Sequence, residues 1–127
     1  MTRVALIGAG KMGISHLSIL GAHPDVEMVG VSDTSKMVLD VFKKYSAFPC
    51  YTDYSDMLEN AKPDAVFVAV PTKLHAPMVK NILHKGMHVF AEKPLCLNAE
   101  EGWDLVELAS QKSLVNQVGY HNKFIGT

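Results

Sequence analysis

The chain has 127 residues, of which 48% are hydrophobic and 20% charged, and its formal net charge is −1 at pH 7. This length fits one domain with an apolar core, and the balanced charge provides no basic face for binding DNA or RNA. No apolar run approaches the roughly 18–20 residues that span a bilayer, and no signal-peptide layout precedes the first strand, so we expect a cytoplasmic protein.

Along the first half of the chain, short apolar runs typical of strands alternate with apolar residues that are spaced as on one face of a helix. Val4 to Ile7 is a continuous apolar run, which is typical of a strand buried on both faces of a parallel sheet. Glycines follow this run, and Lys11 to Gly21 is predicted to be a helix. The next predicted elements are a strand at Met28–Ser32, a helix carrying Val38, Val41, Phe42 and Tyr45, a weak strand at Phe48–Tyr51 and a short helix at Asp53–Asn60.

The second half of the chain repeats this alternation. Ala65 to Val70 is the strongest strand signal, and Trp103 is assigned to packing of the last helix. Because parallel neighbours need crossover helices, the order predicts an α/β fold with a doubly wound, Rossmann-type sheet of about six strands. A helix that ends at Gly86 is predicted from the apolar spacing of Met78, Val79, Ile82 and Leu83, and a strand follows at His88–Ala91. The last helix begins with an Asn98/Glu101 capping box, ends near Lys112 and has the apolar residues Leu105, Val106, Leu108 and Ala109. A final strand is predicted at Leu114–Tyr120.

The turn between the first strand and the first helix matches the pattern G-x-G-x-x-G. Gly8 would permit the tight turn, Gly10 would let the backbone approach a pyrophosphate, and Gly13 would let the helix pack close to the strand. The free N–H groups at the helix start would face the phosphate charge. The alternative is a plain strand-to-helix turn. The predicted pyrophosphate site consists of Gly8, Ala9, Gly10, Lys11, Met12 and Gly13.

An acidic residue follows the second strand, about 20 residues beyond the glycine turn. Asp33 at this position would accept hydrogen bonds from the adenosine ribose hydroxyls and would repel a 2′-phosphate, so NAD is preferred over NADP. Lys36 would weaken that preference if it swings toward the ribose. The alternative is that Asp33, Thr34 and Ser35 only cap the following helix.

Two further strand ends carry unusual residues, and ligands of such sheets bind at the carboxyl ends of the strands. Val70-Pro71-Thr72 leads to His75, and Pro71 lacks the N–H that would continue the strand. Glu92-Lys93-Pro94 follows the next strand. An ion pair at a strand exit, followed by a proline whose peptide bond can be cis, is difficult to explain by packing alone.

Together these motifs resemble the N-terminal domain of the glucose–fructose oxidoreductase / inositol dehydrogenase / rhizopine-catabolism (Gfo/Idh/MocA) family. The resemblance covers essentially the whole chain, and the Glu-Lys-Pro motif is its most specific element. It implies a nicotinamide enzyme that oxidises or reduces sugars, polyols and related molecules. The residues that carry it are Gly8–Gly13 with His16, Val70-Pro71-Thr72 with His75, and Ala91-Glu92-Lys93-Pro94-Leu95.

The resemblance also implies roles for the motif residues. In the family, the lysine of the motif lies beside the nicotinamide and the substrate, so this role transfers to Lys93, and Glu92 would orient the lysine and touch the cofactor. Lys93 would donate a hydrogen bond to the substrate oxygen, and burial would lower its pKa toward that needed for proton transfer. The alternative is a solvent-exposed lysine in a loop.

The remaining site residues are less determined by the sequence. His75 either contacts the ligand near the nicotinamide or caps a helix start, and His16 is expected to pack on the first helix rather than touch the ligand. The predicted cofactor contacts outside the glycine turn are Asp33, Val70, Pro71, Thr72, His75, Glu92, Lys93 and Pro94. The candidate substrate contacts are Lys93, His121, Asn122 and Lys123, and family members commonly have an arginine near Lys123.

A second domain is implied as well, supplying much of the substrate pocket, catalytic Asp and His residues and an oligomer interface. We therefore expect residues 1–127 to be a dinucleotide-binding domain, truncated before that domain, that binds NAD(H) but is inactive alone, whereas the full-length enzyme is a homo-oligomer. A natural stand-alone nucleotide-binding protein is the alternative. A non-catalytic redox-sensing module, or a Rossmann domain that binds FAD or S-adenosylmethionine, also stays open.

No metal site is expected. Cys50 and Cys96 lie far apart and form no CxxC pattern, so both are expected to be free thiols. His84 and His88 have a His-x-x-x-His spacing, but Gly86 would break the helix between them. The sequence does not specify which sugar or polyol is the substrate.

Overall fold

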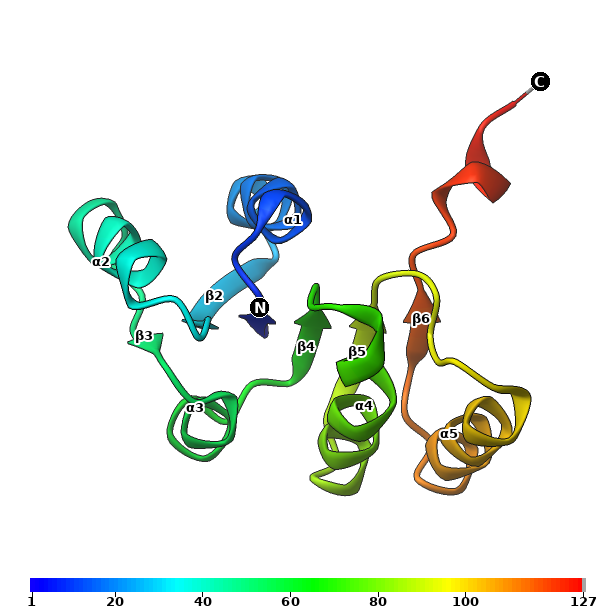
Figure 1. The fold of residues 1–127 in the computed structure, drawn as a ribbon. Coiled ribbons are helices and arrows are strands. Elements are labelled where there is room, and N and C mark those ends of the chain that lie inside the picture. The colour runs from blue at the N-terminus through cyan, green and yellow to red at the C-terminus, as the bar shows by residue number, and fades with distance from the viewer. Residues whose placement is uncertain (127) are drawn as a thin grey trace.

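Strands β1 (Thr2–Ile7) and β4 (Ala65–Val68) pair in parallel at the centre of the sheet in the computed structural model, which describes residues 1–126. Within these residues the sheet has six strands in the order β3-β2-β1-β4-β5-β6, all parallel (Figure 1). The outer strands are β2 (Val26–Ser32), β3 (Cys50–Tyr51), β5 (His88–Ala91) and β6 (Asn116–Val118).

Helices cover both faces of this sheet. In Figure 1, α1 and α2 lie on one face and α3, α4 and α5 on the other. Their bounds are α1 Lys11–Ala22, α2 Lys36–Tyr45, α3 Tyr54–Ala61, α4 His75–His84 and α5 Ala99–Gln111, with short 3₁₀ helices η1 at Thr72–Leu74 and η2 at His121–Phe124. The doubly wound sheet expected from the alternating pattern is therefore confirmed.

The strand order reverses between β1 and β4. The chain runs outward from β1 through β2 to β3, then returns to place β4 on the other side of β1 and continues outward to β6. The connections after β1 and β4 therefore leave toward opposite faces, which opens a crevice at the carboxyl ends of these two strands. In sheets of this kind, that crevice is where ligands bind.

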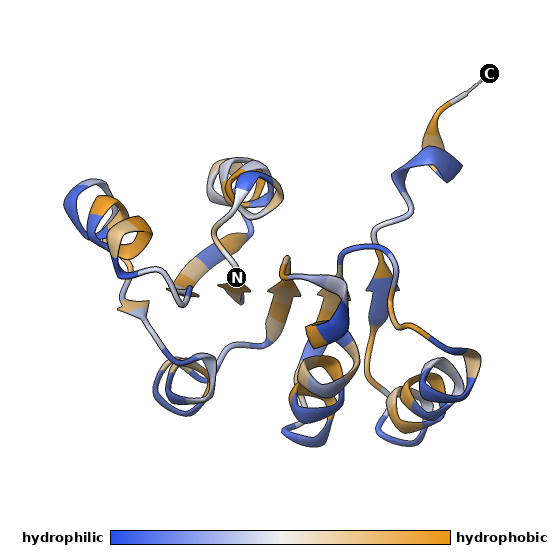
Figure 2. Cartoon of the chain, viewed as in Figure 1, coloured by the Kyte–Doolittle hydropathy of each residue, from blue (hydrophilic) through white to orange (hydrophobic). Residues whose placement is uncertain are grey.

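The core has two layers because β1 is buried on both faces. Ala5 and Ile7 belong to a cluster with residues of α3, α4 and α5, whereas Leu6 belongs to a second cluster with Leu39 of α2. Successive strand side chains point to opposite faces, so one short apolar run supplies both layers. Figure 2 shows the matching hydropathy: the central strands β1 and β4 are apolar, the edge strand β6 is mainly polar, and polar residues lie on the sides of the helices that face away from the sheet.

Side-chain caps define where most helices begin. Ser35, Asp53 and Asn98 each accept a backbone N–H of the first turn of α2, α3 and α5. Asn98 accepts from the N–H of Glu101 at 2.9 Å, which is one half of the expected capping box. Gly86, with φ of +78°, follows the end of α4. By contrast, α1 has Gly10 as its N-cap and no side-chain cap, so the first N–H groups of the helix have no such partner.

The edge strands and one helix differ from expectation. β3 and β6 are shorter than predicted because each has a partner on one side only, and β4 ends at Val68 rather than Val70. The prediction that Trp103 packs inward is wrong, since this side chain is 72% exposed on α5. None of the helices in the described residues is long and apolar enough to cross a membrane.

Candidate functional site

The glycine turn connects β1 to α1 at the crevice. Gly8 has φ of +93°, and a Cβ there would overlap the carbonyl oxygen of Ala69 at the exit of β4. A Cβ at Gly13 would overlap the carbonyl of Gly8, so the helix approaches the turn more closely than a side chain allows. Gly10, by contrast, faces open space. The turn thus leaves the start of α1 bare for a ligand that approaches the backbone.

Asp33, directly after β2, is bonded to this turn. Its Oδ2 accepts the N–H of Ala9 at 2.8 Å, and its Oδ1 accepts the N–H of Ser35 at 2.7 Å. The cap of α2 itself is Ser35, whose hydroxyl accepts from Val38. Asp33 therefore does more than begin a helix, because it fixes the glycine turn relative to β2 and places a carboxylate beside it.

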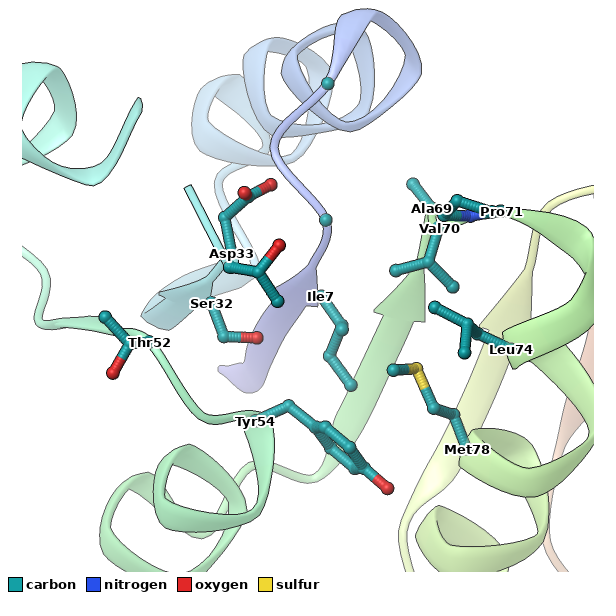
Figure 3. Close-up of a pocket in the computed structure, with 13 residues that line it drawn as sticks. Ile7, Ser32, Asp33, Thr52, Tyr54, Ala69, Val70, Pro71, Leu74 and Met78 are labelled. Carbon is teal, nitrogen blue, oxygen red and sulfur yellow. The ribbon is translucent and has the colours of Figure 1, made fainter. Parts of the chain in front are cut away.

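A hollow of about 260 Å³ opens below the turn. Figure 3 shows Ser32 and Asp33 on one side, Val70, Leu74 and Met78 on the other, and Ile7 and Tyr54 between them. The walls are mainly apolar, with the Asp33 carboxylate at the rim. The remaining lining residues are Gly8, Gly10, Thr34, Thr52, Ala69 and Pro71.

One buried polar group in this hollow lacks a partner. Ser32 is 2% exposed, and its Oγ forms no hydrogen bond within the described residues. A buried hydroxyl without a partner costs about 1–3 kcal/mol, and native structures contain few of them. Sequence reasoning missed Ser32 because a serine at the end of a strand carries no signal of its own.

His75 connects the exits of β4 and β5. It is 1% exposed, with Nδ1 2.7 Å from the carbonyl oxygen of Pro94 and Nε2 2.8 Å from that of Val70. A neutral ring donates to one of these carbonyls, and the doubly protonated ring donates to both. The cap interpretation of His75 is wrong, because α4 has Leu74 as its N-cap and no side-chain cap bond. His75 instead links the segment around Val70 to the segment around Pro94 through their backbone carbonyl groups.

His16 and Glu92 meet on the opposite face of the sheet. The Nε2 of His16 lies 2.5 Å from Oε1 of Glu92, and its ring packs against Phe67 and Phe90. His16 packs, as expected, but it also contacts a motif residue 76 positions away. The expectation that Glu92 orients Lys93 is not met here, because the carboxylate faces His16. A pattern read along the chain does not reveal such a pair.

Lys93 follows Glu92 at the exit of β5 and is exposed. The prediction that its ammonium is buried is therefore wrong for the part of the chain that the structure describes. The Lys93–Pro94 peptide bond is cis. A second hollow, of about 430 Å³, lies beside Glu92 and includes Met12, His16 and His121 in its wall. Asn122 and Lys123 are exposed in η2 and do not line it.

The structure thus places part of the predicted set in two hollows at the carboxyl ends of the strands. Gly8, Gly10, Asp33, Val70 and Pro71 border the first hollow, and Met12, Glu92 and His121 border the second. The predicted residues that line neither hollow are Ala9, Lys11, Gly13, Thr72, His75, Lys93, Pro94, Asn122 and Lys123. Within residues 1–126, no group of three or more His, Cys, Asp or Glu side chains is arranged to hold a metal ion.

Comparison with known proteins adds a family. The sequence model of an oxidoreductase family with an NAD-binding Rossmann fold, Gfo/Idh/MocA, matches residues 2–120. Among curated proteins, a glycosyl hydrolase family 109 protein of Shewanella sp. (strain ANA-3) is 33% identical over 121 residues, which cover 87% of this chain and 26% of that protein. An uncharacterized oxidoreductase, YrbE, of Bacillus subtilis is 28% identical over 120 residues, which cover 94% and 35%.

Two solved structures of similar fold contain a nicotinamide cofactor. Scyllo-inositol dehydrogenase from Lactobacillus casei, solved with NAD(H) and scyllo-inositol, superposes with a TM-score of 0.90 at 26% identity and covers 98% of this chain and 38% of that one. GenD2 from gentamicin A biosynthesis, in complex with NAD, gives a TM-score of 0.87 at 28% identity and covers 93% and 34%. The chain therefore spans about a quarter to two fifths of the length of these relatives.

Proposed function

The chain belongs to the Gfo/Idh/MocA oxidoreductase family as its NAD-binding Rossmann domain, and from this premise we propose that it positions NAD(H) for hydride transfer to or from a sugar-like or polyol hydroxyl or carbonyl. The observation that carries the proposal is the bare start of α1 beside a carboxylate and an apolar hollow. This combination provides backbone N–H groups for a pyrophosphate, an acceptor for ribose hydroxyls and a slot for a base.

The two hollows suit the two halves of a dinucleotide. Gly8 and Gly10 line the first hollow and Met12 lines the second, so both adjoin the same glycine turn. The proposed pyrophosphate site between them comprises Gly8, Ala9, Gly10, Lys11, Met12 and Gly13. The adenosine half would enter the first hollow, next to Asp33, and the nicotinamide half would lie toward Glu92.

The cofactor preference follows from Asp33. Its carboxylate is held in place by two backbone N–H groups, so it cannot easily turn away from a ligand. Ribose hydroxyls would donate to it, whereas a 2′-phosphate would meet like charge. Lys36, which is exposed at the start of α2, is the cation nearest in sequence that would offset this repulsion. We therefore assign NAD as the preferred cofactor.

The reaction chemistry needs few groups from this chain. When bound, the nicotinamide supplies or accepts the hydride. Lys93, which is exposed after the end of β5, would donate a hydrogen bond to the substrate oxygen and stabilise its negative charge. His75 would keep the backbone around Pro94 fixed beneath it. The proposed cofactor contacts at the exits of β4 and β5 are Val70, Pro71, Thr72, Glu92, Lys93 and Pro94, of which Val70 and Pro71 border the first hollow and Glu92 borders the second. The proposed substrate contacts are His121, Asn122 and Lys123.

The substrate class is supported by the relatives. The Lactobacillus casei enzyme is an inositol dehydrogenase solved with its polyol, at a TM-score of 0.90. The rest of a longer protein would complete the substrate pocket and the oligomer interface. On this proposal, the 127 residues alone bind the cofactor without measurable turnover.

Cleavage of a glycosidic bond is a second candidate activity. It is favoured by the 33% identity to the Shewanella proteins named as glycosyl hydrolases of family 109. Assays of the whole protein distinguish the two activities. A dehydrogenase that oxidises an inositol reduces NAD, which raises the absorbance of NADH, whereas a hydrolase releases the chromophore from a nitrophenyl glycoside.

The cofactor proposal is tested by calorimetric titration of the 127-residue chain with NAD, NADP, FAD and S-adenosylmethionine in parallel. We expect heat of binding from NAD, weaker binding of NADP and none from the other two. Asp33→Asn should lose part of the preference for NAD. Tight binding of FAD or S-adenosylmethionine without a response to NAD would refute the proposal.

A further inference from the structure

Ser32 ends β2 with its backbone engaged and its hydroxyl free. Its carbonyl oxygen accepts the N–H of Gly8 at 2.8 Å, and the residue pairs with Ile7 of β1 and Tyr51 of β3. The side chain is buried, yet its Oγ has no partner within the described residues. Packing alone does not account for a hydroxyl here, because an alanine methyl group would fill nearly the same space without an unsatisfied group.

The position of the hydroxyl indicates what would satisfy it. Ser32 lines the first hollow, and Figure 3 shows its oxygen directed into the space beside Ile7. Asp33, the next residue, lies at the rim, where ribose hydroxyls would bind. Ser32 therefore lies deeper in the hollow than the proposed ribose position, on the side where the base of the same nucleoside would enter.

The surrounding wall suits a flat, mainly apolar ring. Ile7, Leu74 and Met78 provide apolar contacts, and the ring of Tyr54 forms part of the wall. Among the lining residues, Ser32 is the one buried residue with a polar side chain, since Asp33 and Tyr54 are half-buried and Thr34 and Thr52 are exposed. Binding pockets of this kind use a few placed polar groups to fix a ligand's orientation.

We propose that Ser32 is a recognition residue for the adenosine half of the cofactor, with Oγ forming a hydrogen bond to that half inside the hollow. This inference rests on the proposed binding of NAD(H), and it adds a residue that the glycine and Asp33 signature does not include. The hydroxyl has no hydrogen-bond partner among the described residues and would gain one when the nucleotide binds. Ser32 thus lowers the stability of the free protein and raises its affinity for the ligand.

This trade predicts two effects of opposite sign from one substitution. In Ser32→Ala, the free chain should melt at a higher temperature than the wild type, because an unsatisfied buried hydroxyl is removed. Its affinity for AMP should fall about three- to tenfold, the loss of one hydrogen bond. A serine that served only the fold would give the reverse for stability, with a lower melting temperature.

The experiment measures the melting temperature without ligand and the affinity for AMP and for nicotinamide mononucleotide by calorimetry. The variants are Ser32→Ala and Ser32→Cys, whose thiol nearly keeps the shape but bonds weakly. Ser110→Ala is the control, since Ser110 is an exposed serine on α5 that lines neither hollow. We expect both Ser32 variants to weaken AMP binding, and Ser110→Ala to leave the affinity for AMP unchanged. Nicotinamide mononucleotide should bind all variants equally.

The outcomes separate this inference from the proposal beneath it. If wild-type protein binds AMP and NADH but the Ser32 variants bind AMP equally well, the inference is overturned while the proposed function stands. The inference also fails if Ser32→Ala lowers the melting temperature together with the affinity. If wild-type protein binds neither AMP nor NADH, both the proposed function and the role of Ser32 are refuted.

Discussion

The imidazole of His16 and the carboxylate of Glu92 are in contact, with Nε2 2.5 Å from Oε1, although 76 positions separate the two residues. This contact joins α1, which begins at the glycine turn, to the first residue after β5. Both side chains are mostly buried, at 18% and 14% exposure. The stacked rings of Phe67 and Phe90 lie beneath His16, so the pair is supported from the sheet.

We expect His16 and Glu92 to be energetically coupled. A double-mutant cycle with His16→Ala and Glu92→Ala, measured by urea unfolding, should give a coupling energy of about 0.5–3 kcal/mol. His16→Phe serves as the control, because it retains an aromatic ring on Phe67 and Phe90 but removes the bond to Glu92. Additive effects of the two alanine substitutions would show that the contact contributes nothing to stability.

Asp33 should determine which nicotinamide cofactor binds. In Asp33→Asn the like charge facing a 2′-phosphate is removed, so the ratio of NADP to NAD affinity should rise roughly tenfold. The matched control is Asp53→Asn, since Asp53 accepts the N–H of Ser55 at 2.7 Å as Asp33 accepts that of Ser35, but borders no hollow. Calorimetry with both cofactors measures the ratio, and an equal change in the two variants would contradict a specific role for Asp33.

The central strands and the glycine turn could be predicted because their signals are local. β1 is buried on both faces and therefore reads as an unbroken apolar run, and three glycines at fixed spacing indicate a turn that approaches a ligand. β3 and β6 were predicted too long, because apolar residues continue past the point where a neighbouring strand is available to pair.

The rest of the site depends on distances in space. The role of His75 comes from two carbonyl groups, one five and the other nineteen residues away, and that of His16 from a residue on another element. Ser32 is distinguished only by what its hydroxyl lacks. No spacing of residues along the chain predicts these contacts. The exposure of Lys93 and Trp103 likewise depends on how the elements pack.

His75 should be a strong determinant of stability. His75→Ala removes both carbonyl contacts and leaves a cavity beneath the motif loops, so the free energy of unfolding should fall by about 2–5 kcal/mol. His84→Ala, at the exposed end of the same helix, should change it by no more than about 0.5 kcal/mol. Urea denaturation of both variants provides the comparison, and similar stabilities for the two would show that the bridge is dispensable.

Cys50 should ionise less readily in the folded chain than in the unfolded one. Burial raises the pKa of its thiol, and the charge of Lys43 opposes this in part. Because the unfolded thiol loses its proton at lower pH, the contribution of Cys50 to stability should decrease as the pH rises through the ordinary thiol range. The rate of alkylation by iodoacetamide against pH, read by mass spectrometry, should give a higher midpoint in native protein than in urea. Lys43→Gln should raise the native midpoint further, and identical profiles in native and unfolded protein would contradict the effect of burial.

Substitution of Lys93 in the whole protein should affect catalysis but not cofactor binding. Lys93 is exposed and lines neither hollow, so Lys93→Ala should leave folding and NAD affinity nearly unchanged. Loss of the hydrogen bond to the substrate oxygen should lower turnover about a hundredfold or more. Lys73→Ala is the matched control, because Lys73 is an exposed lysine in the segment that follows β4. Measurements of kcat with an inositol substrate and of NAD affinity distinguish the outcomes. Unchanged turnover in Lys93→Ala would favour a non-catalytic NAD(H)-binding module, whereas lost NAD affinity would assign Lys93 to cofactor binding alone.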